Sequence, residues 1–293
     1  MSHSLVFQPS ADAIYGFPGA QLLERVDSPF QRIEVWDTPR LGRLFTLDGR
    51  PMTSTGDEFI YHESMVHPGA IAHPGPARAL VLGGGDGGAA RQLLKHREIE
   101  RIVVAELDAD VIRLTQQYLP DVHGGAFDDP RVEVVVGDAA DFVARASIDP
   151  QERFDLVIFD LTPPDSPAAS LYTPAFYAQI KRVMNPQATL SLHLGSPYFH
   201  AARVAALLDD LCASFDTVRP LATFVPLYGS PWMMASASDA LDPAALTGAD
   251  VADRLSARQI EHLKWYDAAS HVSLFASGAA ARDKLSQFLK PLR

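Results

Sequence analysis

The stretch that decides the fold is Ala79–Leu82 (ALVL), which runs directly into Gly83-Gly84-Gly85-Asp86-Gly87-Gly88. An apolar run of strand length that leads through a glycine-rich loop into a helix, here to about His96, is typical of one unit of a parallel α/β sheet. Five glycines around one aspartate let a ligand approach the backbone closely. The loop alone is a weak indication of binding, because a tight strand-to-helix connection has the same composition.

Four further apolar runs of strand length carry polar residues at or just beyond their C-terminal ends. They are Ile102–Glu106, Val132–Val136, Leu156–Asp160 and Leu190–Leu194. Helices are predicted between them, over Asp110–Tyr118 and from Pro174, with Thr173 as N-cap. Strands that alternate with helices predict an α/β fold with a doubly wound parallel sheet, whose ligands bind outside the carboxyl ends of the strands.

The first third of the chain has a different pattern. Short strands are predicted over Gln31–Trp36, Arg43–Leu47 and Arg50–Thr53, with a turn at Asp48-Gly49. A helix is expected to start in Asp57–Met65. His67–Pro76 holds three prolines and two glycines and is predicted to be a linker. The predicted domains are therefore a β-rich one over 1–67 and a larger one over 68–293, in which Ala235–Asp253 is expected to be a solvated connection followed by a helix.

Composition excludes several classes of protein. The 293 residues are 47% hydrophobic and 21% charged, and no window reaches the ~20 apolar residues of a membrane span. A net charge of −11 argues against a nucleic-acid partner. It is compatible with a cationic substrate, but solubility is the favoured interpretation of the charge. The N-terminus lacks a secretory signal, so we expect a cytoplasmic protein. The single cysteine, Cys212, excludes an intramolecular disulfide and a CxxC knuckle, and is expected to pack within a helix.

Two carboxylates at strand ends indicate a nucleoside site. Glu106 ends the second strand of the α/β part, where a carboxylate can accept both hydrogen bonds of a ribose diol. Asp138 follows the third strand and could accept from the exocyclic amine of adenine. No second glycine pattern suggests a pyrophosphate, which disfavours NAD. S-adenosylmethionine or a relative, with no phosphate, fits better.

A third carboxylate, Asp160, ends the fourth strand and precedes a loop stiffened by Pro163 and Pro164. An aspartate there suits a group held inside a cleft. Considered alone, a turn or N-cap aspartate is an equally good interpretation.

Ordered motifs over Gln31–Phe275 resemble the polyamine aminopropyltransferases, the family of spermidine and spermine synthases. The motifs are LFTLDG, GDEFIYHE, LVLGGGDGGAARQLLKH, VVAELDADVI, DDPRVEVVVGDAADFV, FDLVIFDLTPPDSPAASLYTPAFY and KWYDAASHVSLFA. GGGDGG together with DEFxYHE and SLYTxxFY is far more specific than any one motif. The resemblance implies a small N-terminal β-domain and a Rossmann-like, methyltransferase-type catalytic domain, in a homodimer or homotetramer.

The resemblance also implies site residues. The catalytic residues would be Asp160 and Tyr61. Decarboxylated S-adenosylmethionine, a co-substrate rather than a tightly bound cofactor, would be held by Glu106 at the ribose, Asp138 and Ala139 at the adenine, Gln31 above it, and the loop residues Gly83, Gly85, Asp86 and Gly87. The small-molecule amine would meet His62, Asp86, Asp160, His193 and Tyr228. No metal is implied.

These residue types make chemical sense. An alkylamine is protonated at neutral pH and only its free base attacks carbon, so a carboxylate beside a tyrosine hydroxyl can accept the proton and orient the lone pair. Aligning the two reactants would supply most of the acceleration. A carboxylate at Asp86 would attract the bare ammonium of the decarboxylated compound and repel the carboxylate of intact S-adenosylmethionine.

The sequence departs from the family pattern D-x-[ST]-D-P, because Pro163 stands where the second aspartate is expected. Asp165 is a weaker candidate to compensate. His193 replaces an expected glutamine, either as a substrate contact or as a core histidine. Trp232 either narrows the amine channel or packs against neighbouring side chains, and packing is the favoured interpretation.

The predicted function is aminopropyl transfer to a putrescine-like or longer amine. The departures from the family pattern weaken the inference about which amine is the acceptor. They do not affect the inference that decarboxylated S-adenosylmethionine is the co-substrate. Two alternatives remain: an S-adenosylmethionine-dependent methyltransferase of the same fold, and a non-catalytic polyamine- or nucleoside-binding protein, motivated by the missing aspartate.

Overall fold

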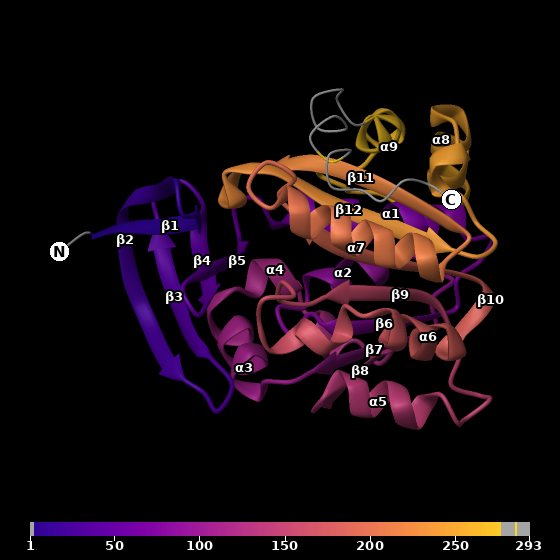
Figure 1. Ribbon diagram of the computed structural model, residues 1–293, viewed down its shortest axis with the longest axis horizontal. Coiled ribbons are helices and arrows are strands. Elements are labelled where there is room, and N and C mark those ends of the chain that lie inside the picture. Colours follow the sequence, from indigo (N-terminus) through magenta and orange to yellow (C-terminus); the bar gives the residue numbers. More distant parts are fainter. Residues whose placement is uncertain (1–2, 277–284, 286–293) are drawn as a thin grey trace.

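A computed structural model describes residues 3–276 and residue 285 of the chain, in two sheets flanked by helices (Figure 1). The first sheet is antiparallel, with its five strands in chain order. They are β1 (His3–Ser10), β2 (Ala13–Asp27), β3 (Arg32–Thr38), β4 (Gly42–Leu47) and β5 (Arg50–Ser54). The three strands predicted in this region are confirmed as β3, β4 and β5.

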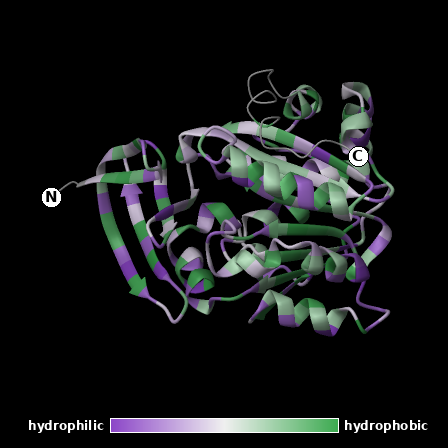
Figure 2. Cartoon of the chain, viewed as in Figure 1, coloured by the Kyte–Doolittle hydropathy of each residue, from purple (hydrophilic) through white to green (hydrophobic). Residues whose placement is uncertain are grey.

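The second sheet has seven strands in the order β11-β12-β10-β9-β6-β7-β8. They are β6 (Arg78–Gly83), β7 (Arg101–Glu106), β8 (Val132–Val136), β9 (Phe154–Asp160), β10 (Met184–Gly195), β11 (Thr217–Val225) and β12 (Ser230–Ser238). The first five are parallel, and β12 and β11 add an antiparallel edge. In Figure 2 the central strands are green along most of their length, as expected for parallel strands covered on both faces.

Helices cover both faces of this sheet. Packed on one face are α1 (Glu58–Ala72), α2 (Gly88–Leu93), α8 (Gly248–Ala257) and α9 (Ala268–Phe275). On the other are α5 (Ala139–Ala146), α6 (Pro174–Val183) and α7 (Ala201–Ser214). The short α4 (Pro120–His123) and η1 (Ala126–Asp128) lie beside α2, while η2 (Pro167–Leu171), η3 (Pro226–Tyr228) and η4 (Pro243–Ala245) are 3-10 turns. The alternating α/β pattern predicted from the sequence is confirmed.

The N-terminal sheet rests on α3 (Ala109–Tyr118) of the α/β part. A buried cluster joins them: Ile33, Val35, Phe45 and Leu47 of the sheet, Val111 and Leu114 of α3, its C-cap Leu119, and Val122 of α4. This contact fixes the N-terminal sheet beside the carboxyl ends of the parallel strands, so both sheets contribute to one site.

Three expectations need correction. The predicted linker His67–Pro76 is wrong in its first half, because α1 continues to Ala72 with Pro68 inside it and is buried almost throughout. Helices avoid interior proline on average, but tertiary burial outweighs that preference here. The division at residue 67 stays a prediction, and the last residues of the second predicted domain, 277–284 and 286–293, lie outside the described residues.

The other two corrections concern burial. Ala235–Asp253 begins as the buried end of β12 and is not solvated there; only its η4 and α8 parts follow the prediction. Cys212 is in a helix, α7, but its side chain is exposed and does not pack. The helical period identified the apolar face of α7 correctly, and Cys212 falls outside that face.

Candidate active site

The site lies where the order of the parallel strands reverses, between β6 and β9. These two strands pair in register so that Gly83 stands beside Asp160, and the Gly84 amide donates to the Asp160 carbonyl at 3.0 Å. Gly83 has φ +75, and a Cβ there would lie 2.3 Å from that carbonyl oxygen. Glycine is required because the loop passes this close. A crevice at such a reversal is the usual ligand site of open α/β sheets.

A cavity of about 360 Å³ opens at this point. Twelve of the thirteen predicted site residues line it: Gln31, Tyr61, His62, Gly83, Gly85, Asp86, Glu106, Asp138, Ala139, Asp160, His193 and Tyr228. Gly87 does not. It has φ +76 and caps α2, and a Cβ on it would meet His123 and Phe127. Glycine is needed at this position because the backbone is left-handed there. The sequence alone could not distinguish this requirement from contact with a ligand.

Glu106 lies at one end of the cavity and is held by backbone amides. Its Oε2 accepts from the Gly85 amide at 3.1 Å, and its Oε1 from the Asp108 amide at 2.9 Å. Burial raises the pKa of Glu106 to about 7, against the opposing effect of these amides. Each oxygen keeps a further lone pair for a ligand hydroxyl.

The two other predicted nucleoside contacts are also anchored. Asp138 caps α5, its Oδ1 accepting from the Ala140 amide at 2.7 Å. Gln31 donates through Nε2 to Asp108 Oδ2 at 3.2 Å, which ties the N-terminal sheet to the loop after β7. The sequence analysis missed Asp108; its position two residues beyond Glu106, as the N-cap of α3, was the available signal.

Tyr61 and Asp160 meet in the middle of the cavity. The Tyr61 hydroxyl donates to Asp160 Oδ1 at 2.9 Å, although the two residues are 99 positions apart. The other oxygen, Oδ2, is buried and has no hydrogen-bond partner among the described residues. Burial, followed by the nearby charge of Asp86, raises the pKa of Asp160 to about 6. A group with this pKa is ionised at neutral pH and can still take a proton.

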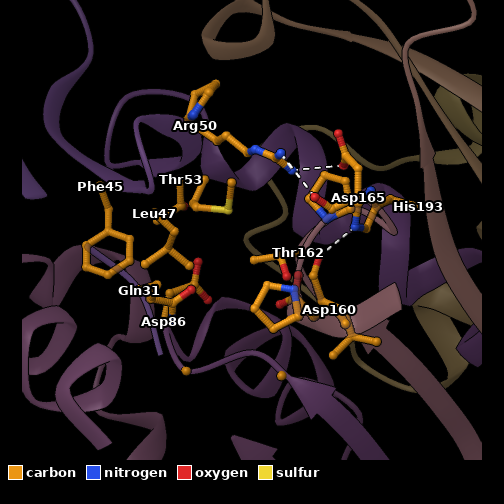
Figure 3. A pocket seen from close by; sticks show the side chains of 18 of the residues that line it. Gln31, Phe45, Leu47, Arg50, Thr53, Asp86, Asp160, Thr162, Asp165 and His193 are labelled. Carbon is orange, nitrogen blue, oxygen red and sulfur yellow. Dashed lines mark hydrogen bonds and ion pairs between the residues drawn. The ribbon is translucent and has the colours of Figure 1, made fainter. Parts of the chain in front are cut away.

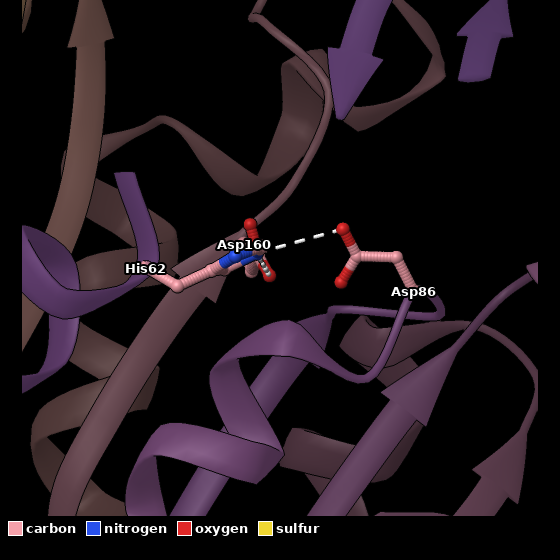
Figure 4. A group of neighbouring side chains, drawn as sticks. All are labelled: His62, Asp86 and Asp160. Atoms are coloured by element: carbon pink, nitrogen blue, oxygen red, sulfur yellow. Dashed lines mark ion pairs between the residues drawn. The ribbon is translucent and has the colours of Figure 1, made fainter. Parts of the chain in front are cut away.

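His62 stands between three carboxylates, two of which, Asp86 and Asp160, are drawn in Figure 4. Its Nδ1 is 2.8 Å from Glu58 Oε2, and its Nε2 is 3.5 Å from Asp86 Oδ2 and 3.7 Å from Asp160 Oδ2. Burial alone would raise the pKa of Asp86, but the His62 imidazole and further hydrogen bonds hold it below its usual value. The trio of His62, Asp86 and Asp160 places one ring nitrogen and two carboxylate oxygens within 4.8 Å of one another. The site is therefore built to hold positive charge.

Aromatic rings line the cavity beyond Tyr61. Tyr228 donates its hydroxyl to the Met52 carbonyl at 2.7 Å, and its ring lies 4.2 Å from that of Trp232. Trp232 in turn stacks on His193 at 5.7 Å, with the ring planes 18° apart. Trp232 therefore both packs and lines the cavity, so the two interpretations offered for it are not exclusive.

His193 is a buried, neutral histidine that faces the cavity. Its Nε2 is 2.6 Å from the Leu161 carbonyl, which can only accept, so the proton is on Nε2. Burial lowers the pKa of His193 to about 4. The Nδ1 lone pair is buried without a hydrogen-bond partner among the described residues and is available to a donor.

Asp165 does not replace the missing carboxylate as a free group. Its Oδ1 is bound by Arg50 at 2.8 Å (Figure 3) and also by Arg203 at 3.2 Å. The three residues come from β5, the β9–α6 loop and α7, and together they tie the loop that holds Pro163 to both parts of the molecule. The sequence analysis missed both arginines, because neither lies in a motif.

Comparison with known proteins gives consistent similarities. Residues 58–243 match the spermine/spermidine synthase domain. A polyamine aminopropyltransferase of Nitrosomonas europaea is 42% identical over 293 residues, 100% of this chain and 89% of the relative. Another, from Pyrobaculum calidifontis, is 38% identical over 249 residues, 84% of this chain and 86% of the relative.

Solved structures agree with the sequence relatives. A spermidine synthase crystallised with the transition-state analogue AdoDATO has a TM-score of 0.85 at 29% identity, covering 94% of this chain and 92% of that one. The spermidine synthase of Thermotoga maritima has a TM-score of 0.82, also at 29% identity, covering 94% and 90%. The expected Rossmann-like fold, with a small N-terminal β-sheet, is thereby confirmed.

Proposed function

This chain belongs to the spermine/spermidine synthase family, and from that premise we propose that it transfers the aminopropyl group of decarboxylated S-adenosylmethionine to a polyamine acceptor. The products are a spermidine- or spermine-type amine and methylthioadenosine. The observation that carries the proposal is Asp160 Oδ2, which is buried in the cavity beside the glycine loop and has no hydrogen-bond partner in the described part of the chain, while Tyr61 holds the other oxygen.

The residues along the cavity have different roles, according to the part of the substrates that each one lies near. Glu106, with Asp138 and Gln31, lies where it can hold the nucleoside. Asp86, between this end and Asp160, supplies the charge for the aminopropyl ammonium. In the transfer, the amine nitrogen forms a bond to the aminopropyl carbon while the bond between that carbon and sulfur breaks. The electron pair of the broken carbon–sulfur bond stays on sulfur. Asp160 accepts the proton that the attacking amine loses.

Tyr61 positions the carboxylate of Asp160. Burial, then the charge of Asp160, raises the pKa of Tyr61 far above its usual value, so its hydroxyl stays protonated and donates. That hydrogen bond fixes Oδ1 and leaves Oδ2 directed to the substrate, which lowers the cost of aligning the amine.

The acceptor end favours an amine unlike putrescine. Pro163 supplies no carboxylate, and Asp165 is already neutralised by Arg50 and Arg203. We propose that a longer or less symmetrical amine, with fewer charges to neutralise, fits this end better than a short symmetrical diamine. Neutral His193 and the rings of Tyr228 and Trp232 would line its chain.

Other features are proposed from the family resemblance. Decarboxylated S-adenosylmethionine would act as a co-substrate and not as a tightly bound cofactor, and the enzyme would work in the cytoplasm as a homodimer or homotetramer. Among the described residues, no helix has both the length and the apolar character needed to cross a membrane.

The test is mass spectrometry of reactions that contain decarboxylated S-adenosylmethionine and one amine each: putrescine, cadaverine, diaminopropane, spermidine or agmatine. We expect methylthioadenosine together with an amine heavier by one aminopropyl unit. No product from any amine, with intact S-adenosylmethionine bound equally well in a parallel titration, would support the methyltransferase or binding-protein alternative instead.

A further inference from the structure

His62 is enclosed on every side by groups that fix its charge. Glu58 of α1 faces Nδ1, and the other Glu58 oxygen is bound by Arg91 of α2 at 2.6 Å. Asp86 of the glycine loop and Asp160 of β9 face Nε2. The imidazole side chain is only 2% exposed, so water does not screen these charges effectively.

The ring nitrogens cannot both be satisfied by a neutral imidazole. A carboxylate that is bound by arginine accepts hydrogen bonds, so Nδ1 carries a proton toward Glu58. In a neutral ring Nε2 would then present a lone pair to two carboxylate oxygens, at 3.5 and 3.7 Å. A proton on Nε2 turns both of these repulsions into attractions.

We propose that His62 is protonated on both nitrogens while the site is empty and releases the Nε2 proton when the cationic co-substrate binds. The inference rests on the proposed aminopropyl transfer. The Nε2–H bond breaks, its electron pair stays on nitrogen, and the proton passes to buffer. No other bond changes, and the total charge between Asp86 and Asp160 is kept as an ammonium replaces the proton.

The His62 ring is sterically confined. Its charge therefore changes on binding, while its position does not. A Cβ on Gly88 would lie 2.2 Å from His62 Cε1, so the ring is packed against the backbone of the α2 N-terminus. It cannot turn away when an ammonium arrives at Asp86. Two cations this close in a buried site repel strongly, whereas a neutral ring offers its Nε2 lone pair to the ammonium as an acceptor.

The surrounding charges support this assignment. Burial lowers the pKa of His62, but Asp86, Glu58 and Asp160 together raise it well above the usual histidine value. Asp57, the N-cap of α1, interacts electrostatically with His62 as well. Arg91 is paired with Glu58, and Lys95 also interacts with that carboxylate electrostatically.

The experiment is isothermal titration calorimetry of the full chain at about pH 8, with EDTA, in two buffers of different ionisation enthalpy. The probes are decarboxylated S-adenosylmethionine and methylthioadenosine, which shares its adenosine but has no ammonium or sulfonium. We expect about one more proton released with the first probe than with the second. Any contribution from Glu106 at the ribose is common to both probes and cancels.

His62→Gln keeps an amide donor but cannot ionise, and should abolish the difference between the probes. His193→Gln, which removes a histidine that is already neutral in the same cavity, should keep it. Glu58→Gln offers a second route if His62→Gln does not fold: it removes one carboxylate from the imidazole and should reduce proton release. Binding of methylthioadenosine reports that each variant is folded.

Two failures can be told apart. Equal proton release from both probes in the wild-type protein, or a difference that survives in His62→Gln, overturns the inference while leaving aminopropyl transfer intact. If neither probe binds and no amine yields methylthioadenosine, the proposed function itself is wrong.

Discussion

Single residues in this site acquire their chemistry from burial and from their neighbours. Glu106 and Asp160 are both buried carboxylates with raised pKa values, about 7 and about 6. Glu106 is fixed by two backbone amides, whereas one oxygen of Asp160 has no hydrogen-bond partner within residues 3–276 or at residue 285. The first is built to bind and the second to take a proton, so substitutions should separate these two functions.

Asp160→Asn should lower kcat by about 10²–10⁴-fold while leaving affinity for decarboxylated S-adenosylmethionine nearly unchanged. The amide keeps the shape and can still accept from Tyr61, but it cannot take the proton. Steady-state formation of methylthioadenosine measures the first quantity and calorimetry the second. Near-normal turnover in this variant would refute the role assigned to Asp160.

Glu106→Ala should act on binding first, weakening affinity for the co-substrate on the order of 10- to 100-fold, the usual cost of a lost charged hydrogen bond. The change also leaves the Gly85 and Asp108 amides without their acceptor. Glu261→Ala, which removes an exposed carboxylate, is the matched control. Unchanged affinity in Glu106→Ala would contradict the nucleoside assignment.

At the scale of elements, the glycine loop between β6 and α2 shows what the sequence could and could not predict. The strand, the loop and the helix were all readable from composition, although α2 ends at Leu93 and only turns continue to His96. The sequence did not predict that each glycine of the loop is required for a different structural reason. Gly83 passes a backbone carbonyl, Gly87 needs a left-handed turn and Gly88 makes room for His62.

Gly88→Ala should therefore lower both activity and stability, although α2 itself would tolerate alanine. The added Cβ would overlap the His62 ring, and such overpacking costs about 1–3 kcal/mol. Gly75→Ala is the control, since a Cβ there meets no described residue within 4 Å. Denaturant unfolding and methylthioadenosine formation measure the two effects. If both variants match the wild type, the packing of His62 against this glycine is unimportant.

At the scale of the whole molecule, the N-terminal sheet and the α/β part share one cavity. A second buried polar cluster lies farther along α1, where this helix packs against α2. His67 Nδ1 is 3.0 Å from His96 Nε2, and His67 Nε2 is 3.3 Å from Gln92 Oε1. Both histidines are fully buried. Burial lowers the pKa of His67 to about 3 and that of His96 well below its usual value, so both are neutral in the folded protein.

This cluster predicts acid sensitivity. An unfolded histidine binds a proton near pH 6.5, whereas folded His67 does so only near pH 3. Its contribution to the free energy of unfolding is therefore complete above about pH 6.5 and is lost progressively as the pH falls toward about 3. His67→Gln should give a shallower decline between about pH 7 and about pH 5 in urea unfolding. His262→Gln, which changes a histidine with a 92% exposed side chain, should decline as the wild type does; an equally steep decline in His67→Gln would refute the assignment.

The sequence by itself determined the parallel α/β pattern, three of the five strands of the N-terminal sheet and the polar residues at strand ends. These follow from local periodicity and from the rule that parallel strands end at one edge. The tertiary structure decided the state of those residues: Asp165 occupied by Arg50 115 positions away, and His62 enclosed by three carboxylates. Hydrogen-bond partners and charge depend on which distant segments pack together and how much water they exclude, and no local spacing encodes that.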